Sequence, residues 1–147
     1  MESLEYAEKI VKSFKEKADH NKNESLFSFT LILVASLTAP LFITLGKGEF
    51  LSKIIPSILS VIAAGLTSWL QLRKPQKLWS MYRGSQRLIE DQIVKYKFKI
   101  GDYKSTENPE SLLAEKTAEV ALNAHNEWTT VIPSPESISF KKKENNG

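Results

Sequence analysis

The chain has 147 residues, a formal net charge of +3 and no cysteine. The lack of cysteine excludes a disulfide framework, a thiol nucleophile and a cysteine-based metal site. The small net charge does not favour nucleic acid as a partner. Lysines and glutamates alternate along both ends of the chain, which is typical of solvated helix faces. The length predicts one compact unit.

Residues 1–25 are expected to form an N-terminal cytoplasmic helix. Its apolar residues recur at three- and four-residue spacing, at Leu4, Ala7, Val11, Phe14 and Ala18. One interpretation is a helix that lies on anionic lipid. The narrow stripe and the glutamates among the lysines favour packing against the other polar helices of the chain. His20, Asn21 and Asn23 predict a break before the apolar run that follows.

Two uncharged apolar runs occupy residues 26–45 and 54–72. At a rise of about 1.5 Å per residue, each forms a helix of roughly 30 Å, the thickness of a bilayer's hydrocarbon core. A short polar loop joins them, so residues 26–72 predict a two-helix transmembrane hairpin. The first run is long and follows a helix-forming segment, which favours a retained anchor over a signal peptide. The alternative is a hairpin buried inside a soluble complex.

Positive charges lie on the same side of both runs. Lysines precede the first run, and Arg73, Lys74 and Lys77 follow the second, whereas the connecting loop holds only Lys47 and Lys53. The positive-inside rule therefore predicts that both termini face the cytoplasm. The lipid bilayer is the first partner that the sequence implies.

The second run carries small and hydroxyl-bearing residues on one face, namely Ser57, Ser60, Ala64, Thr67 and Ser68. Small residues at this spacing let helices approach closely in lipid. One interpretation is packing against the first transmembrane helix of the same chain. The other is an interface between subunits or the wall of a pore.

Residues 73–130 are expected to form a cytoplasmic helical hairpin. Its first helix begins after Pro75 and runs to about Ile100, where Gly101 is a plausible C-terminal stop that needs a positive φ. Its apolar residues are spaced like a coiled-coil seam.

The second helix of this hairpin begins with Asn108 as its cap and Pro109 at its first position, and it runs to about Thr129. Residues 131–147 are expected to be a disordered tail. The predicted fold class is thus an all-α membrane protein, in which the N-terminal and C-terminal cytoplasmic helices form a bundle.

Catalytic signatures are not evident in the sequence. His20 and His125 have no partners at metal-ligand spacing, and no nucleophile–histidine–acid pattern or glycine-rich phosphate loop occurs. The spans hold no ionisable residue, which argues against proton-coupled transport. We therefore expect a protein that is not an enzyme and that needs no cofactor or metal.

The segments YRGSQRLIEDQIVKYKFKIGDY, LLAEK and NAHNEW resemble the bacterial two-transmembrane SLATT-type families, over roughly residues 26–128. The matched positions are Tyr82, Arg83, Leu88, Glu90, Asp91, Tyr96, Gly101, Tyr103, Leu112, Leu113, Glu115 and Trp128. The chain departs from the pattern at Gln86 and Arg87, and at Ala124 and His125, where an acidic residue is expected. These departures leave open whether an ion pair braces the cytoplasmic helices.

The resemblance implies a membrane effector of a bacterial conflict system in the inner membrane, paired with a nucleotide-signalling or sensor protein. The implied outcome is an oligomeric pore that disrupts the membrane. The alternative is a membrane-anchored scaffold that recruits a partner through its cytoplasmic helices. The matched aromatics are interpreted as core or interfacial residues. Arg83 is expected to pair with an acidic residue or to meet the headgroups, with phosphate binding as the alternative.

Overall fold

The computed structural model describes residues 2–131. Its helices are α1 (Glu2–Leu45), α2 (Ile55–Arg73), α3 (Pro75–Phe98) and α4 (Pro109–Val131). A π-helical turn, η1 (Phe50–Ile54), leads into α2, and a 3-10 turn, η2 (Gly101–Lys104), separates α3 from α4. Residues 2–131 contain no strand, so the expected all-α class is confirmed. The predicted tail lies outside the described residues, except that Val131 ends α4.

α1 is one continuous helix of 44 residues, so the break predicted at His20, Asn21 and Asn23 is wrong. Asn21 is only 6% exposed, and its Nδ2 donates to the carbonyl oxygen of Lys17 at 2.7 Å. It lines a groove shared with Leu78 of α3. Because its amide group bonds back to its own helix and the residue is buried, the weak helix propensity of Asn is overridden.

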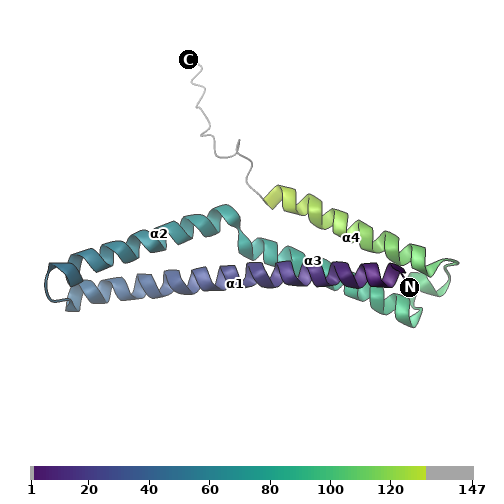
Figure 1. Cartoon of the computed structure of the whole chain (residues 1–147), viewed down its shortest axis with the longest axis horizontal. Coiled ribbons are helices and arrows are strands. Elements are labelled where there is room, and N and C mark those ends of the chain that lie inside the picture. The colour runs from purple at the N-terminus through teal and green to yellow at the C-terminus, as the bar shows by residue number, and fades with distance from the viewer. Residues whose placement is uncertain (1, 132–147) are drawn as a thin grey trace, which may run out of the picture.

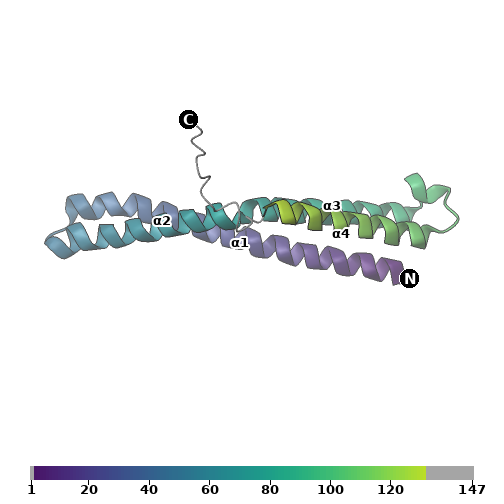
Figure 2. The same cartoon turned by 90° about the horizontal axis from the view of Figure 1, so that it is seen from above.

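The other helices lie beside different parts of α1. α2 runs along the C-terminal part of α1, whereas α3 and α4 lie along its N-terminal part (Figures 1 and 2). Lys74 makes the junction between α2 and α3 in a left-handed conformation, with φ of 49°. Pro75 follows at the first position of α3, where its missing N–H is tolerated.

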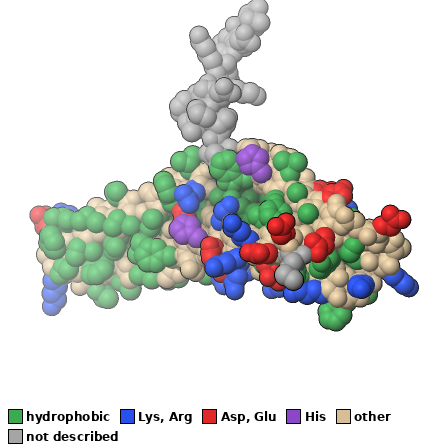
Figure 3. Space-filling model, turned by 45° about the vertical axis from the view of Figure 1, so that its right-hand side comes forward, with side chains coloured by type: hydrophobic (Ala, Val, Ile, Leu, Met, Phe, Trp, Pro, Cys, Tyr) green, Lys and Arg blue, Asp and Glu red, His purple; other side chains and the backbone are tan. Residues whose placement is uncertain are grey.

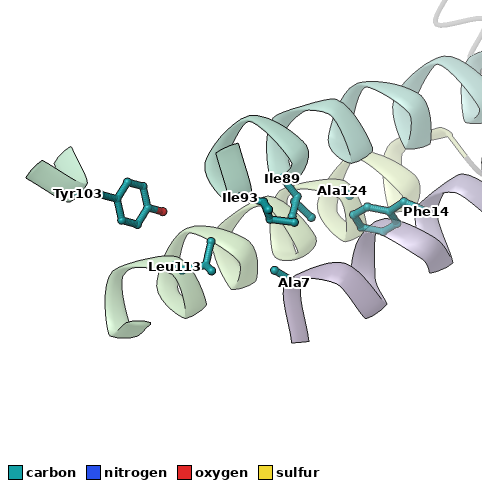
Figure 4. Packing of buried hydrophobic residues seen from close by; sticks show 7 residues of the cluster. All are labelled: Ala7, Phe14, Ile89, Ile93, Tyr103, Leu113 and Ala124. Carbon is teal, nitrogen blue, oxygen red and sulfur yellow. The ribbon is translucent and has the colours of Figure 1, made fainter. Parts of the chain in front are cut away.

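The main core forms where α1, α3 and α4 meet (Figure 4). Ile89 and Leu113 are fully buried there, together with Ala7 and Phe14 of α1. Burying an aliphatic side chain of this size contributes about 1.5–3 kcal/mol. The apolar stripe of the N-terminal segment thus packs against the chain's own helices, which was the favoured interpretation.

The α1–α2 end has a different surface. Apolar side chains dominate it, and most of the charged side chains lie over the rest of the molecule (Figure 3). Of the most apolar 18-residue stretch of α1, only 11% is buried. Of the corresponding stretch within Phe50–Lys104, only 6% is buried. By length and composition, two helices can therefore cross a membrane. A helix in the core of a soluble protein would be mostly buried instead.

Candidate functional site

The small-residue face of α2 points away from α1. All five residues predicted to form it are exposed: Ser57, Ser60, Ala64, Thr67 and Ser68. The half-buried residues of α2 lie on the opposite side, at Ile55, Leu59, Ala63, Leu66 and Leu70. Ser60 alone also borders the groove between α1 and α2. The structure therefore does not place this face in the contact between the two apolar helices.

The hydroxyl groups of this face are satisfied by backbone carbonyls of α2 and of the π-helical turn η1 that leads into it. Each donates a hydrogen bond of 2.7–2.9 Å to the carbonyl oxygen four residues earlier, at Ser57, Ser60, Thr67 and Ser68. Such bonds remove the cost of placing an unpaired hydroxyl in an apolar medium. The face can therefore lie against lipid or against another helix without an unsatisfied donor.

Small residues do line the α1–α2 contact, but they belong to α1. Ser28, Ala35 and Ala39 are buried there, and Ala35 and Ala39 line a groove with Ser60 and Ala63 of α2. The small residues predicted to form an interface were those of α2, and this seam on α1 was not predicted. Its signal was the seven- and four-residue spacing of small side chains along the first apolar run.

A polar network joins α1 to α3. Arg83 Nη2 lies 2.5 Å from Asp19 Oδ1, which confirms the expected acidic partner. Arg83 Nη1 donates to Gln86 Oε1 at 2.8 Å, and Gln86 Nε2 donates to Glu90 Oε1 at 2.6 Å. Gln86 is 4% exposed. Its neutral amide accepts from a guanidinium and donates to a carboxylate, which an ionised acidic residue could not do.

The departures from the family pattern at Gln86 and Arg87 left open whether an ion pair holds these helices together, and the network shows that one does. This ion pair joins α3 to α1, and Asp19 of α1 provides the acid. A second pair, Lys97 with Glu8 at 3.2 Å, joins the same two helices farther from the apolar runs.

A second polar cluster lies where the apolar runs begin and end. Trp69 Nε1 donates to Glu24 Oε1 at 3.0 Å, and Arg73 Nε lies 2.9 Å from the same oxygen. The guanidinium of Arg73 also lies 6.0 Å from the centre of the Trp69 ring. The Glu24 side chain is 19% exposed. These contacts join α1 to α2, and sequence analysis did not foresee them because their partners are 45 to 49 residues apart.

The matched tyrosines are packed into the fold. Tyr82 packs on Phe14 with ring centres 5.8 Å apart, and burial raises the pKa of Tyr82. Tyr96 meets Tyr103 edge to face at 6.0 Å, and the Tyr103 hydroxyl donates to Gln92 at 3.2 Å. Burial and then the charges of Asp102 and Asp91 raise the pKa of Tyr103. These contacts fit the interpretation of core aromatics.

Two further matched residues lie far apart: Gly101 lies before the start of α4, and Trp128 lies near its end. Gly101 has the expected positive φ, 62°, but it opens η2, because Lys99 with φ of 52° already caps α3. Trp128 is far along α4, where its ring stacks on His125 at 6.0 Å and borders a groove with Tyr82. The matched residues therefore do not form one site.

Within residues 2–131, no group of three or more His, Asp or Glu side chains could hold a metal ion. Residues 9–111 match the family described as Protein of unknown function (DUF4231). The chain belongs to this family. No curated protein and no solved structure matches the chain.

The DUF4231 match covers most of α1, all of α2 and α3, and the start of α4. Both polar clusters, around Asp19–Arg83 and around Glu24–Arg73, lie inside the DUF4231 region. Trp128 lies outside it. DUF4231 is described as a family of unknown function, so membership identifies the kind of protein and assigns no activity.

Proposed function

We propose that this chain is an oligomeric two-span membrane protein that acts as a pore-forming or channel-like effector in bacterial defence. Its role is mechanical and electrical, and it carries out no catalysis. The proposal is supported by the two apolar helices, by the unpartnered face of α2 and by the resemblance to SLATT-type families.

In this proposal α1 and α2 cross the bacterial inner membrane as a hairpin. Residues 26–45 and 54–72 lie in the hydrocarbon, and the loop with Lys47 and Lys53 lies on the side opposite the cytoplasm. The N-terminal half of α1 then forms a cytoplasmic bundle with α3 and α4. Glu24, Trp69 and Arg73 lie at the boundary, where tryptophan is favoured by its amphipathic ring.

The observation that carries the proposal is the exposure of the small-residue face of α2. At about 100° per residue, its five positions fall within an arc of about 100°, roughly opposite the face that packs on α1. Ser60, Ala64 and Ser68 keep side-chain bulk low along this arc, so a neighbouring helix can approach closely. A second copy of the hairpin is the partner that this face fits.

Two helices cannot enclose an aqueous path, so a pore needs several copies. In an oligomer the small-residue face lies either in the contact between copies or along the pore wall. The cytoplasmic bundle then sets the state of the assembly in response to a nucleotide-signalling or sensor partner. The network of Asp19 and Arg83 holds that bundle in a defined arrangement.

The experiment is reconstitution of the purified full chain in liposomes that hold a self-quenched dye. We expect dye or ion efflux that rises steeply with the protein-to-lipid ratio, and an oligomer in mild detergent. Strictly monomeric protein together with intact liposomes would contradict the proposal.

Two double variants separate the small-residue face from a general change in α2. S60L/S68L adds bulk on the face and should change the flux by about tenfold or more. I58L/I62L makes the same number of leucine substitutions at exposed positions outside the arc and should leave flux near the wild-type level. Equal effects of the two variants on flux would show that the small-residue face has no specific role in the pore.

The second candidate is a membrane-anchored scaffold, which is favoured by apolar side chains left exposed on the cytoplasmic helices. Leu88 of α3, Phe98 of α3 and Leu122 of α4 are 58%, 74% and 60% exposed. Under this alternative L88S or L122S abolishes partner capture, and S60L/S68L leaves it intact. Under the pore proposal S60L/S68L changes the flux, whereas L88S or L122S leaves the flux unchanged.

A further inference from the structure

A groove of about 780 Å³ opens where α1, α2 and α3 meet. It has two chemically different parts. Leu26, Phe29 and Leu70 give it an apolar wall that belongs to the two apolar runs. Lys74, Lys77 and Trp79 give it a polar end at the junction of α2 and α3.

The polar end is cationic and holds an unused donor. Neither lysine makes an ion pair among the described residues, and Trp79 Nε1 is buried without an acceptor. The ammonium group of Lys22 lies 5.8 Å from the centre of the Trp79 ring, which brings a third cation from α1 to the same end.

We propose that this groove binds one anionic phospholipid of the inner leaflet. The phosphate lies between Lys74 and Lys77, beside the Trp79 ring. One acyl chain follows Leu26, Phe29 and Leu70 into the hydrocarbon. The groove volume falls within the range of about 300–1,000 Å³ that is usual for ligand sites.

The position of the groove selects a lipid over a soluble phosphate. A soluble phosphate would use the lysines but would leave the apolar wall in contact with water. A phospholipid matches both ends, because its charged headgroup and its acyl chain are joined at the depth where the apolar runs end. The inference rests on the proposed membrane orientation and is independent of pore formation.

A smaller hollow of about 310 Å³ continues from the groove along α3. It shares Gln76, Trp79 and Ser80 with the groove and ends at Arg83. The headgroup site therefore adjoins the arginine that holds α3 against Asp19. A bound lipid stabilises the junction of α2 and α3 next to the bundle that the proposed function assigns to signalling.

The test is native mass spectrometry of the full-length protein in detergent, titrated with phosphatidylglycerol or with phosphatidylcholine. We expect phosphatidylglycerol to bind about tenfold more tightly, because it is anionic overall, whereas the choline of phosphatidylcholine adds a positive charge that the two lysines repel. K74N/K77Q should lose that preference; asparagine tolerates the left-handed conformation at residue 74. K12Q/K15Q removes two exposed lysines of α1 away from the groove and should keep the preference.

Equal binding of the two lipids, or equal behaviour of the two double variants, would overturn the site. Glycerol 1-phosphate serves as the soluble probe, and displacement of the lipid at equal concentration would overturn the lipid in favour of a soluble phosphate. As a second readout, brominated phosphatidylglycerol in nanodiscs should quench Trp79 in the W69F/W128F variant more than brominated phosphatidylcholine does. Intact lipid preference with no flux in liposomes would reject the pore and retain this site.

Discussion

Arg83 Nη2 of α3 lies 2.5 Å from Oδ1 of Asp19 on α1, so this ion pair joins two residues that are 64 positions apart in the sequence. The two side chains are 31% and 45% exposed. Solvent therefore screens the pair, and its own contribution to stability is about 1 kcal/mol or less. Gln86 adds to the stability of this link, because its buried amide oxygen accepts the second hydrogen bond of Arg83.

Replacing Arg83 by alanine should lower the free energy of unfolding by about 1–2 kcal/mol, because it removes the ion pair and leaves the buried Gln86 oxygen without its donor. Denaturant unfolding in detergent measures this. R87A is the matched control, because Arg87 is 72% exposed and pairs only within α3; its effect should stay within about 0.5 kcal/mol. Equal losses for R83A and R87A would show that the link to α1 contributes nothing.

Two glycines should respond to alanine with opposite signs. Gly101 has φ of 62°, so G101A should destabilise the turn after α3 by about 1–2 kcal/mol. Gly84 lies within α3, and an added Cβ would meet no atom within 4 Å. G84A should stabilise the protein by about 0.5–1 kcal/mol, because alanine favours helix. The melting temperatures of the two variants check this, and shifts of the same sign would contradict it.

Thr117 is a fully buried residue of α4 whose hydroxyl has no hydrogen-bond partner. T117V keeps the shape and removes the unpaired group, so it should stabilise the protein by about 1 kcal/mol. Thr129 of the same helix is exposed and donates to the carbonyl oxygen of Asn126 at 2.7 Å. T129V should therefore have little effect. A lower melting temperature for T117V would mean that its hydroxyl is satisfied in solution.

Stability should fall at alkaline pH through Tyr103. Burial, Asp102 and Asp91 raise its pKa in the folded chain above 10.0. Below pH 10 both states keep the phenol proton, and above it the unfolded chain releases the proton first, which favours unfolding. The slope due to this one group is at most about 1.4 kcal/mol per pH unit.

The measurement is unfolding free energy between pH 9 and 12, with tyrosinate absorbance followed in parallel. Y103F should reduce the alkaline loss. Y6F, which removes a hydroxyl from an exposed side chain of α1, is the control. An unchanged pH profile in Y103F would show that Tyr103 does not contribute to it.

Sequence analysis located α3 and α4 closely because their ends carry local signals. The predicted helix begins after Pro75, whereas α3 includes Pro75 and ends at Phe98, two residues before the predicted Ile100. Asn108 Oδ1 accepts from the backbone N–H of Ser111 at 3.1 Å, which confirms the predicted cap of α4. Prolines and caps act within one turn of helix, so they can be read without the fold.

The error at Asn21 has a tertiary origin. Three polar residues in a short stretch indicate a break when α1 is considered alone. The buried position beside α3 stabilises the helical form instead. Local propensity amounts to a few tenths of a kcal/mol per residue, and packing is larger.

The sequence by itself determined the two apolar runs, the positions of α3 and α4, and the all-α class. These follow from hydrophobic length, helical periodicity and capping residues, which are properties of short segments. Only the tertiary structure decided which way the small-residue face of α2 points, and that Asp19 and Glu24 are the partners of Arg83 and Arg73. Both α1 and α2 carry small residues in their apolar runs, and spacing alone does not tell which of these faces meets the neighbouring helix. Ion pairs between distant segments depend on how those helices pack.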